Sequence, residues 1–224
     1  MSPPGRPKGE HRRAQPEGTP SSAPARAPAP GAPVTHLLSL HGFRSSPRSV
    51  KAQRMEAWVR LHRPDLEWLC PQLPPSPRAA IDGVFAAISG WPRERMAVIG
   101  SSLGGFYATA VAERTGCRAV LLNPAVEPAR DLAGYIGEQT AWHGEERFFF
   151  RAEYIDELLA LAPPVPLTRP ERYFAVIAKG DEVLSWREMS GRYAGSPMRL
   201  IEGSDHALSD FETWLPEVIG FLGL

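Results

Sequence analysis

The first candidate for chemistry is a serine in a turn bounded by glycines. The residues GSSLG, Gly100 to Gly104, fit the pattern G-x-S-x-G with Ser102 at its centre, between a short apolar run and an amphipathic stretch. In a strand-turn-helix context this turn forces the central residue into strained backbone angles that lift its hydroxyl clear of the sheet. Glycine is needed at both ends because larger side chains would collide with the adjoining strand or helix. We predict that Ser102 is a nucleophile and that Ser101 faces away from the cleft; a glycine-serine turn without chemistry is the alternative.

A serine hydroxyl attacks efficiently only when a histidine accepts its proton and a carboxylate orients that histidine. On parallel sheets with such a turn, the chain order is serine, acid, histidine, each in a loop after a strand. His206 follows the last apolar run, in EGSDHAL, and is the predicted base. His41 precedes Gly42 in the loop after the first run, opposite the serine turn, and is a candidate for the substrate pocket.

Four carboxylates compete for the position of the acid. Asp181 follows the fifth apolar run, in GDEVLSW, and is the predicted acid. Glu182 and Asp205 are rivals by proximity, and Glu127 occupies an alternative position after the fourth run. Because neighbouring side chains in a loop often diverge, Asp205 is expected to shape the loop rather than to orient the adjacent histidine.

An oxyanion that develops during acyl transfer needs backbone N–H donors, and each is worth roughly 3–4 kcal/mol in studied enzymes. The residue after the nucleophile, Leu103, is expected to supply one donor. Phe43, in the sequence HGF, is expected to supply the second, because Gly42 lets that backbone approach closely.

Short aliphatic runs alternate with longer amphipathic stretches, as expected for strands buried on both faces and separated by helices. Ser46-Pro47 and Ser76-Pro77 each read as a helix N-cap followed by proline, and Gly116 is placed to end a helix. The predicted strands are 36–40, 66–70, 95–100, 118–123, 173–178 and 198–203. The predicted helices are 47–62, 77–89, 103–115, 185–194 and 208–222.

This alternation predicts an α/β fold: a doubly wound, six-stranded, mainly parallel sheet with right-handed crossovers. If the strand order is 2-1-3-4-5-6, strands 1 and 3 are neighbours at the switch point, where ligands bind. The loops that leave these two strands carry HGF and GSSLGG. Two independent motifs are therefore expected at one crevice.

The domain is expected to span residues 34–224. Residues 1–33 contain nine prolines and no Val, Ile, Leu, Phe, Tyr or Trp, so we predict a disordered tail. Lys plus Arg and Asp plus Glu are balanced at 25 each, which argues against nucleic acid or an anionic membrane as the main partner. Cys70 and Cys117 lie in apolar runs and are expected to be reduced and buried. No run is long enough for a membrane span and no export signal is seen, so a cytoplasmic location is expected.

Residues 127–170 are too long for a plain crossover and are expected to form a small cap over the crevice. Of its aromatic residues, Trp142 and Phe149 are the candidates for an acyl pocket, although at least three of the five are expected only to anchor the cap. Arg44 and Arg48 stand beside the oxyanion loop, where a solvated helix start is favoured over contact with an anionic substrate. The five aromatic residues are Tyr135, Trp142, Phe148, Phe149 and Phe150.

With HGFRSSPRSVKA, GSSLGGFYAT, LNPAV, GDEVLSW and SDHAL in this order, the chain resembles the small bacterial YqiA-type esterases of the α/β-hydrolase superfamily. The resemblance runs from about Leu37 to the C-terminus. It implies a minimal α/β-hydrolase sheet that lacks the usual first two strands, with a small helical cap. It also implies hydrolysis of carboxylic esters or acyl thioesters, with Ser102, Asp181 and His206 at the matching positions.

The expected function is that of a serine esterase acting on a small-molecule ester or thioester, without a cofactor. No metal site is expected, because no H-E-x-x-H motif or clustered Cys/His spacing occurs. An acyltransferase or peptidase with the same three residues, and a catalytically silent binding protein of this fold, remain alternatives. The sequence does not indicate the oligomeric state.

Overall fold

The computed structural model describes residues 33–141 and 147–224, and its centre is a six-stranded sheet. All five strand pairings in this sheet are parallel, and the order β2-β1-β3-β4-β7-β8 is the predicted one. The predicted tail lies almost entirely outside the described residues. The strands are β1 (His36–Leu40), β2 (Glu67–Leu69), β3 (Met96–Ser101), β4 (Arg118–Leu122), β7 (Tyr173–Ala178) and β8 (Met198–Ile201).

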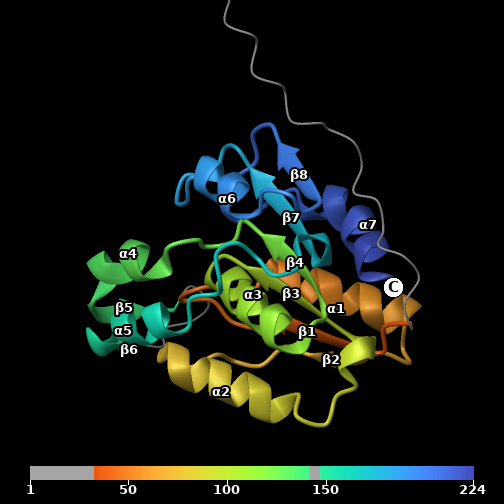
Figure 1. Ribbon diagram of the computed structural model, residues 1–224, viewed down its shortest axis with the longest axis horizontal. Coiled ribbons are helices and arrows are strands. Elements are labelled where there is room, and N and C mark those ends of the chain that lie inside the picture. The colour runs from red at the N-terminus through yellow and green to blue at the C-terminus, as the bar shows by residue number, and fades with distance from the viewer. Residues whose placement is uncertain (1–32, 142–146) are drawn as a thin grey trace, which may run out of the picture.

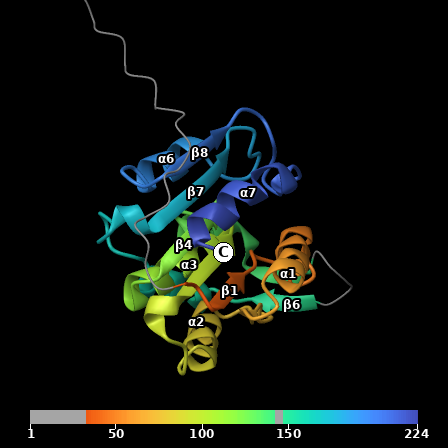
Figure 2. The ribbon, with the colours of Figure 1, turned by 90° about the vertical axis from the view of Figure 1, so that its right-hand side faces the viewer.

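Helices cover both faces of this sheet, as Figures 1 and 2 show. α2, α3 and α6 share a buried cluster with Leu38, Leu40 and the other side chains of one face. α1 and α7 pack on the opposite face, around Leu37 and its neighbours. Successive strand residues thus enter two cores, which explains why the strands read as continuous apolar runs. The helices are α1 (Val50–His62), α2 (Pro77–Ala87), α3 (Leu103–Thr115), α6 (Trp186–Arg192) and α7 (Phe211–Leu222).

Two of the three predicted helix-end signals are confirmed. The Ser76 hydroxyl accepts a hydrogen bond from the backbone N–H of Ala79, 3.1 Å away, with Pro77 as the first residue of α2. Gly116 ends α3 in the left-handed region, at a φ of 80°.

The prediction for Ser46-Pro47 is wrong, because α1 begins only at Val50. Ser46 to Ser49 form a turn instead, closed by a hydrogen bond of 3.1 Å from the N–H of Ser49 to the carbonyl of Ser46. Serine followed by proline is as favourable for the first two positions of a turn as for a helix start, so residue type alone cannot separate the two.

The segment between β4 and β7 forms the cap, at the left of Figure 1. It contains the helices α4 (Pro128–Leu132) and α5 (Glu153–Ala160). It also contains a hairpin of two antiparallel strands, β5 (Gly137–Thr140) and β6 (Arg147–Phe150), which the sequence analysis does not predict. The carboxylate of Glu157 on α5 accepts hydrogen bonds from the Ser76 hydroxyl (2.7 Å) and the Arg78 N–H (3.0 Å), which ties the cap to the start of α2.

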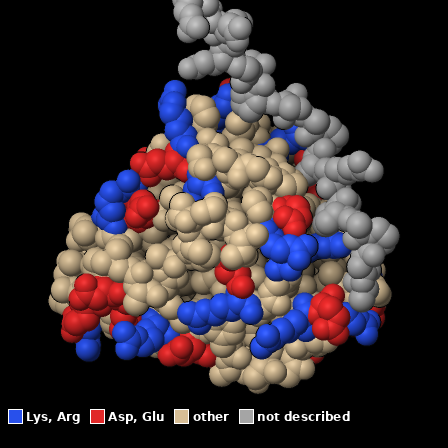
Figure 3. Space-filling model, viewed as in Figure 1, with Lys and Arg blue, Asp and Glu red and all other residues tan. Residues whose placement is uncertain are grey.

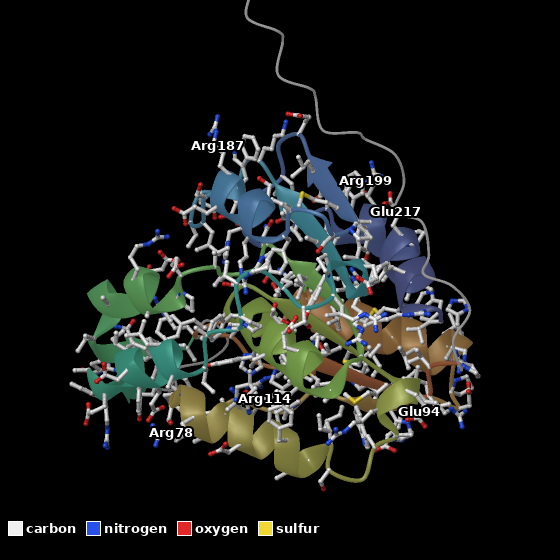
Figure 4. All side chains as sticks on the ribbon, in the orientation of Figure 1. Arg78, Glu94, Arg114, Arg187, Arg199 and Glu217 are labelled. Carbon is white, nitrogen blue, oxygen red and sulfur yellow. The ribbon has the colours of Figure 1, made fainter. Side chains whose placement is uncertain are left out.

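Charged side chains on the surface form scattered pairs. Basic and acidic residues are interspersed on the face shown in Figure 3. Arg199 of β8 and Glu217 of α7 lie side by side in Figure 4, with nitrogen and oxygen atoms 3.0 Å apart. Among the described residues, no helix combines the length and apolar character required to cross a membrane.

Candidate active site

Ser102 sits at a sharp turn between the last residue of β3 and the first residue of α3. Its φ of 56° and ψ of −123° are strained for a residue with a side chain. A β-carbon on Gly100 would lie 2.1 Å from the carbonyl oxygen of Gly104, and one on Gly104 would lie 2.0 Å from that of Leu40. Both positions therefore require glycine, as the sequence predicts.

Backbone hydrogen bonds hold this strained residue in place. The N–H of Ser102 donates to the carbonyl of Leu122 at the end of β4 (3.0 Å), and its own carbonyl accepts from the N–H of Ala125 (3.0 Å). Ser101 faces the other side of the sheet, where it lines a void of about 20 Å³ together with Lys51 of α1. The two adjacent serines are thus on opposite sides of the sheet.

The structure brings the three predicted residues together. The hydroxyl oxygen of Ser102 is 3.1 Å from Nε2 of His206, and Nδ1 of His206 is 2.8 Å from Oδ2 of Asp181. The Asp181 side chain has no exposed surface, and its other oxygen accepts hydrogen bonds from the N–H groups of Val183 (2.8 Å) and Leu184 (2.7 Å). This buried carboxylate is held in one orientation, which fixes the histidine ring toward the serine.

The three rival carboxylates have other positions. Glu182 accepts a hydrogen bond of 2.9 Å from the backbone N–H of His206 and so supports the loop rather than the ring. Asp205 accepts from both the N–H and the hydroxyl of Ser209, and these bonds lower the pKa of its carboxyl. Glu127 precedes α4 and lines a different, smaller cavity.

Asn123 and Lys51, which the sequence analysis does not identify, both hydrogen-bond to the loop that contains His206. The fully buried amide of Asn123 donates to the carbonyls of Asp205 (2.9 Å) and His206 (3.2 Å) and accepts from the N–H of Ala178 (2.8 Å). Asn123 directly follows β4, in LNPAV. Its position at the carboxyl edge of the sheet is a sequence feature that could have indicated a role near the site.

Lys51 of α1 reaches the same loop from the opposite face, where its ammonium group donates to the carbonyl of Ala207. Burial lowers the pKa of Lys51 from 10.5 to about 8, although the nearby carboxylates of Asp205 and Asp181 oppose that shift. A lysine on an amphipathic helix reads as solvated, so no sequence signal marked it.

The loop after β1 lies against the serine turn, because Leu40 of β1 pairs with Gly100 of β3. A β-carbon on Gly42 would lie 3.1 Å from the β-carbon of Ser102. Leu103 is the first residue of α3, so its N–H has no partner within the helix. Phe43 and Leu103, the two predicted oxyanion donors, both line a cavity of about 310 Å³ beside the turn.

His41 also lines this cavity but is only 6% exposed. Its Nδ1 is 3.0 Å from the carbonyl oxygen of Gly42, and its Nε2 accepts a hydrogen bond of 3.0 Å from the N–H of Leu73. Both ring nitrogens are used within the protein, so His41 holds the loops after β1 and β2 together at the cavity wall.

The aromatic residues of the cap differ in their surroundings. Phe148 lines the cavity, and its ring meets that of Phe43 edge to face, with centroids 5.9 Å apart. Phe149, a predicted pocket residue, is 59% exposed and does not line the cavity, because alternation along β6 turns it away from Phe148 and Phe150. Trp142, the other predicted pocket residue of the cap, lies outside the described residues.

Arg44 and Arg48, the two arginines beside the predicted oxyanion loop, differ in their contacts. Arg44 spans the cavity rim, where its Nε donates to the carbonyl of Thr140 in β5 at 2.7 Å. Arg48 is exposed. Arg44 therefore joins the oxyanion loop to the cap.

Thiol chemistry has no support at this site. Burial raises the pKa of both Cys70 and Cys117 to about 11, so both are protonated at neutral pH. Cys117 is buried and Cys70 is half-buried.

The parallel sheet, the strained serine turn and the acid and histidine loops together define an α/β-hydrolase fold. Solved structures of this fold are similar along most of the chain. Est1E from Butyrivibrio proteoclasticus with bound ferulic acid has a TM-score of 0.64 at 14% identity, covering 84% of this chain and 87% of that one. Alpha/beta hydrolase domain-containing protein 10 from mouse has a TM-score of 0.63 at 16% identity, covering 85% of this chain and 91% of that one. A structure from the description of the metagenome-derived lipolytic enzymes LipS and LipT has a TM-score of 0.61 at 18% identity, covering 89% and 98%.

At the level of sequence, a family model matches residues 36–223, nearly the whole described domain. The chain belongs to the family described as Uncharacterised protein family (UPF0227).

Proposed function

We propose that this protein is a serine hydrolase that cleaves carboxylic esters or acyl thioesters of small molecules through an acyl-serine intermediate. One observation carries the proposal: the series of hydrogen bonds from Ser102 through His206 to the buried carboxylate of Asp181. The similar structures support an ester as substrate, because they include lipolytic enzymes, an esterase domain from Rhodothermus marinus and an esterase from Pyrococcus furiosus.

In the first half of the reaction, the Ser102 oxygen attacks the acyl carbonyl carbon while Nε2 of His206 takes the hydroxyl proton. Asp181 stabilises the imidazolium that forms. The carbonyl oxygen becomes an oxyanion, which the N–H groups of Phe43 and Leu103 stabilise. Collapse of this intermediate breaks the bond to the leaving alcohol or thiol, to which His206 returns the proton.

In the second half, water attacks the acyl-serine carbonyl and gives one proton to His206. The bond between the acyl carbon and the Ser102 oxygen then breaks, and the serine recovers its proton from the histidine. The products are a carboxylic acid and the free enzyme. Apart from the substrate and water, all groups required for this cycle belong to the chain itself, so the proposed reaction needs no cofactor.

Labelling with a fluorophosphonate tests the proposal, because this reagent reacts preferentially with an activated serine. We expect stoichiometric labelling of the wild-type protein and of Ser101→Ala, and none of Ser102→Ala. Ser101→Ala is the matched control because the two serines are adjacent but face opposite sides of the sheet. Absence of label on the wild-type protein would favour a silent binding protein, and label retained by Ser102→Ala would contradict the assignment.

A further inference from the structure

The cavity beside the serine turn accepts one particular part of a substrate. Its walls come from the loops after β1 and β2, from α3 and from the cap hairpin. Among the described residues, none from the loops that follow β7 and β8 lines it. His206, in the loop after β8, must give its proton to the leaving group, so the leaving group lies on the histidine side of Ser102. The acyl group therefore enters the cavity, past the N–H groups of Phe43 and Leu103.

Tyr107 lines this cavity one helical turn beyond Leu103. Residues four apart lie on the same face of a helix and are separated by roughly 6 Å along its axis. Tyr107 is therefore reached by atoms of the acyl group that lie several bonds beyond the carbonyl carbon. Its side chain is almost completely buried, with 3% exposed.

The hydroxyl of Tyr107 differs from those of the other two buried tyrosines. The Tyr173 hydroxyl donates to the carboxylate of Glu113 (2.5 Å), and the Tyr193 hydroxyl is 2.8 Å from that of Thr109. Within residues 33–141 and 147–224, the Tyr107 hydroxyl makes no hydrogen bond. Because its oxygen is not one of the fully buried polar atoms that lack a partner, the hydroxyl keeps accessible surface, and Tyr107 lines the cavity. A hydroxyl at a cavity wall that the protein does not use is available to a ligand.

We propose that Tyr107 is a specificity-determining residue that donates a hydrogen bond to an oxygen atom within the acyl group of the substrate. The preferred substrate is thus an ester or thioester whose acyl group carries an acceptor oxygen beyond the reacting carbonyl, as in an oxo-acyl group. This inference rests on the proposed function and adds the substrate class.

The surroundings of Tyr107 fit a donor for a neutral oxygen. Burial, and then the nearby carboxylate of Glu157, raise the pKa of the Tyr107 hydroxyl well above its usual range, so it keeps its proton. The other polar ring at the wall, His41, already uses both nitrogens within the protein. Leu73, Pro74, Pro75 and Phe148 make much of the remaining wall apolar. Arg44 and Gln72 also line the cavity, and each donates to a backbone carbonyl within the protein. A donor that the protein itself does not use selects an acyl group with an oxygen at a matching position.

The test compares p-nitrophenyl levulinate, whose acyl group carries a ketone oxygen, with p-nitrophenyl pentanoate, which has the same main chain without it. We expect the wild-type protein to have the higher kcat/KM with levulinate. Tyr107→Phe should lower the levulinate-to-pentanoate ratio about tenfold, the loss of one hydrogen bond of about 1.4 kcal/mol. A ratio that changes less than about twofold would overturn the inference.

Tyr193→Phe is the matched control, because its hydroxyl is bonded to Thr109 and lies away from this cavity. It should leave the ratio unchanged and lower the melting temperature, since the Thr109 hydroxyl loses a partner. Tyr107→Phe should not lower the melting temperature, because no bond within the protein is lost. If the wild-type protein hydrolyses neither ester and takes no fluorophosphonate label, the proposed function itself fails. If it hydrolyses both and only the ratio is insensitive to Tyr107→Phe, the acyl-serine chemistry stands and the role of Tyr107 is wrong.

Discussion

The two sides of Ser102 are built by different physical means. On the histidine side, hydrogen bonds between polar groups hold the loops after β4, β7 and β8, with Asn123, Asp181 and Glu182 each bonded to the His206 segment. On the cavity side, aromatic rings pack segments that are far apart in the chain, and Phe43 meets Tyr135, Phe148 and Phe150 edge to face.

This difference suggests that the two sides of Ser102 have different roles in the proposed function: the histidine side determines the reaction, and the cavity side determines the substrate. Hydrogen bonds are directional, so the histidine side accepts few substitutions without losing its geometry. Packing between apolar groups accepts changes of shape at modest cost, so under the proposed function the cavity side would set the preferred acyl group without changing the chemistry. We therefore expect substitutions on the histidine side to act on kcat and those on the cavity side to act on substrate preference.

The largest effect is expected from Asp181→Asn. An amide at this position favours the wrong histidine tautomer and cannot stabilise the imidazolium, so kcat should fall about 10⁴-fold. Ester hydrolysis by the purified variant measures this fall, and its thermal unfolding checks that the chain is folded.

Glu182→Gln is the control for Asp181→Asn. Its amide oxygen still accepts from the N–H of His206, so kcat should fall by less than about tenfold. If Glu182→Gln loses as much activity as Asp181→Asn, the acid has been assigned to the wrong residue.

Gly104→Ala should disturb both sides at once. Its new β-carbon would lie 2.0 Å from the carbonyl oxygen of Leu40, so α3 and the loop that carries Phe43 must move apart. We expect the free energy of unfolding to fall by about 3 kcal/mol or more, measured by urea denaturation.

Gly191→Ala in α6 is the matched control, because nothing lies within 4 Å of its added β-carbon. It should be neutral or stabilise by about 0.5–1 kcal/mol, as expected for alanine in a helix. Equal losses in the two variants would show that the close approach at Gly104 is not the cause.

Phe148→Ala tests the cavity side alone. Removal of this ring opens the cavity wall and its contact with Phe43, so kcat/KM for a pentanoate ester should fall about tenfold. Phe149→Ala, the adjacent and exposed ring, should change kcat/KM less than twofold. The reverse order would mean that the hairpin presents its other face to the substrate.

The effect of Lys51→Met is expected in the pH dependence of stability. Because the pKa of Lys51 is lower in the folded chain, about 8, than its usual 10.5, the unfolded chain binds more protons between these values. The contribution of Lys51 to the free energy of unfolding should therefore rise with pH across this window. Comparison of urea denaturation of the wild-type protein and Lys51→Met at pH 7.5 and 10 measures the rise.

Arg54→Met, on the exposed side of the same helix, should show no such pH dependence relative to the wild-type protein. A difference between wild type and Lys51→Met that falls as pH rises would contradict the burial of this lysine.

The strands and the turn around Ser102 could be predicted because both depend on local patterns. Apolar runs such as YFAVIA become strands buried on both faces, and the glycines around Ser102 permit only a tight turn. The proximity of His206 and Asp181 to Ser102 could be expected because the carboxyl ends of parallel strands meet at one edge of the sheet.

The remaining features depend on contacts between distant segments. Phe148 and Phe149 are identical in type, and only pairing of β6 with β5 decides which one faces the cavity. Lys51 and Tyr107 sit on helices whose sequences do not show what lies opposite them. The prediction at Ser46 is wrong because a turn and a helix start favour the same residues.

The acyl-serine intermediate is the central claim, and mass spectrometry of enzyme quenched during turnover of a p-nitrophenyl ester tests it most directly. We predict a mass increase equal to one acyl group on the peptide that contains Ser102, present in Ser101→Ala and absent from Ser102→Ala. Turnover in which no acyl adduct forms, or an adduct that persists in Ser102→Ala, would contradict the account.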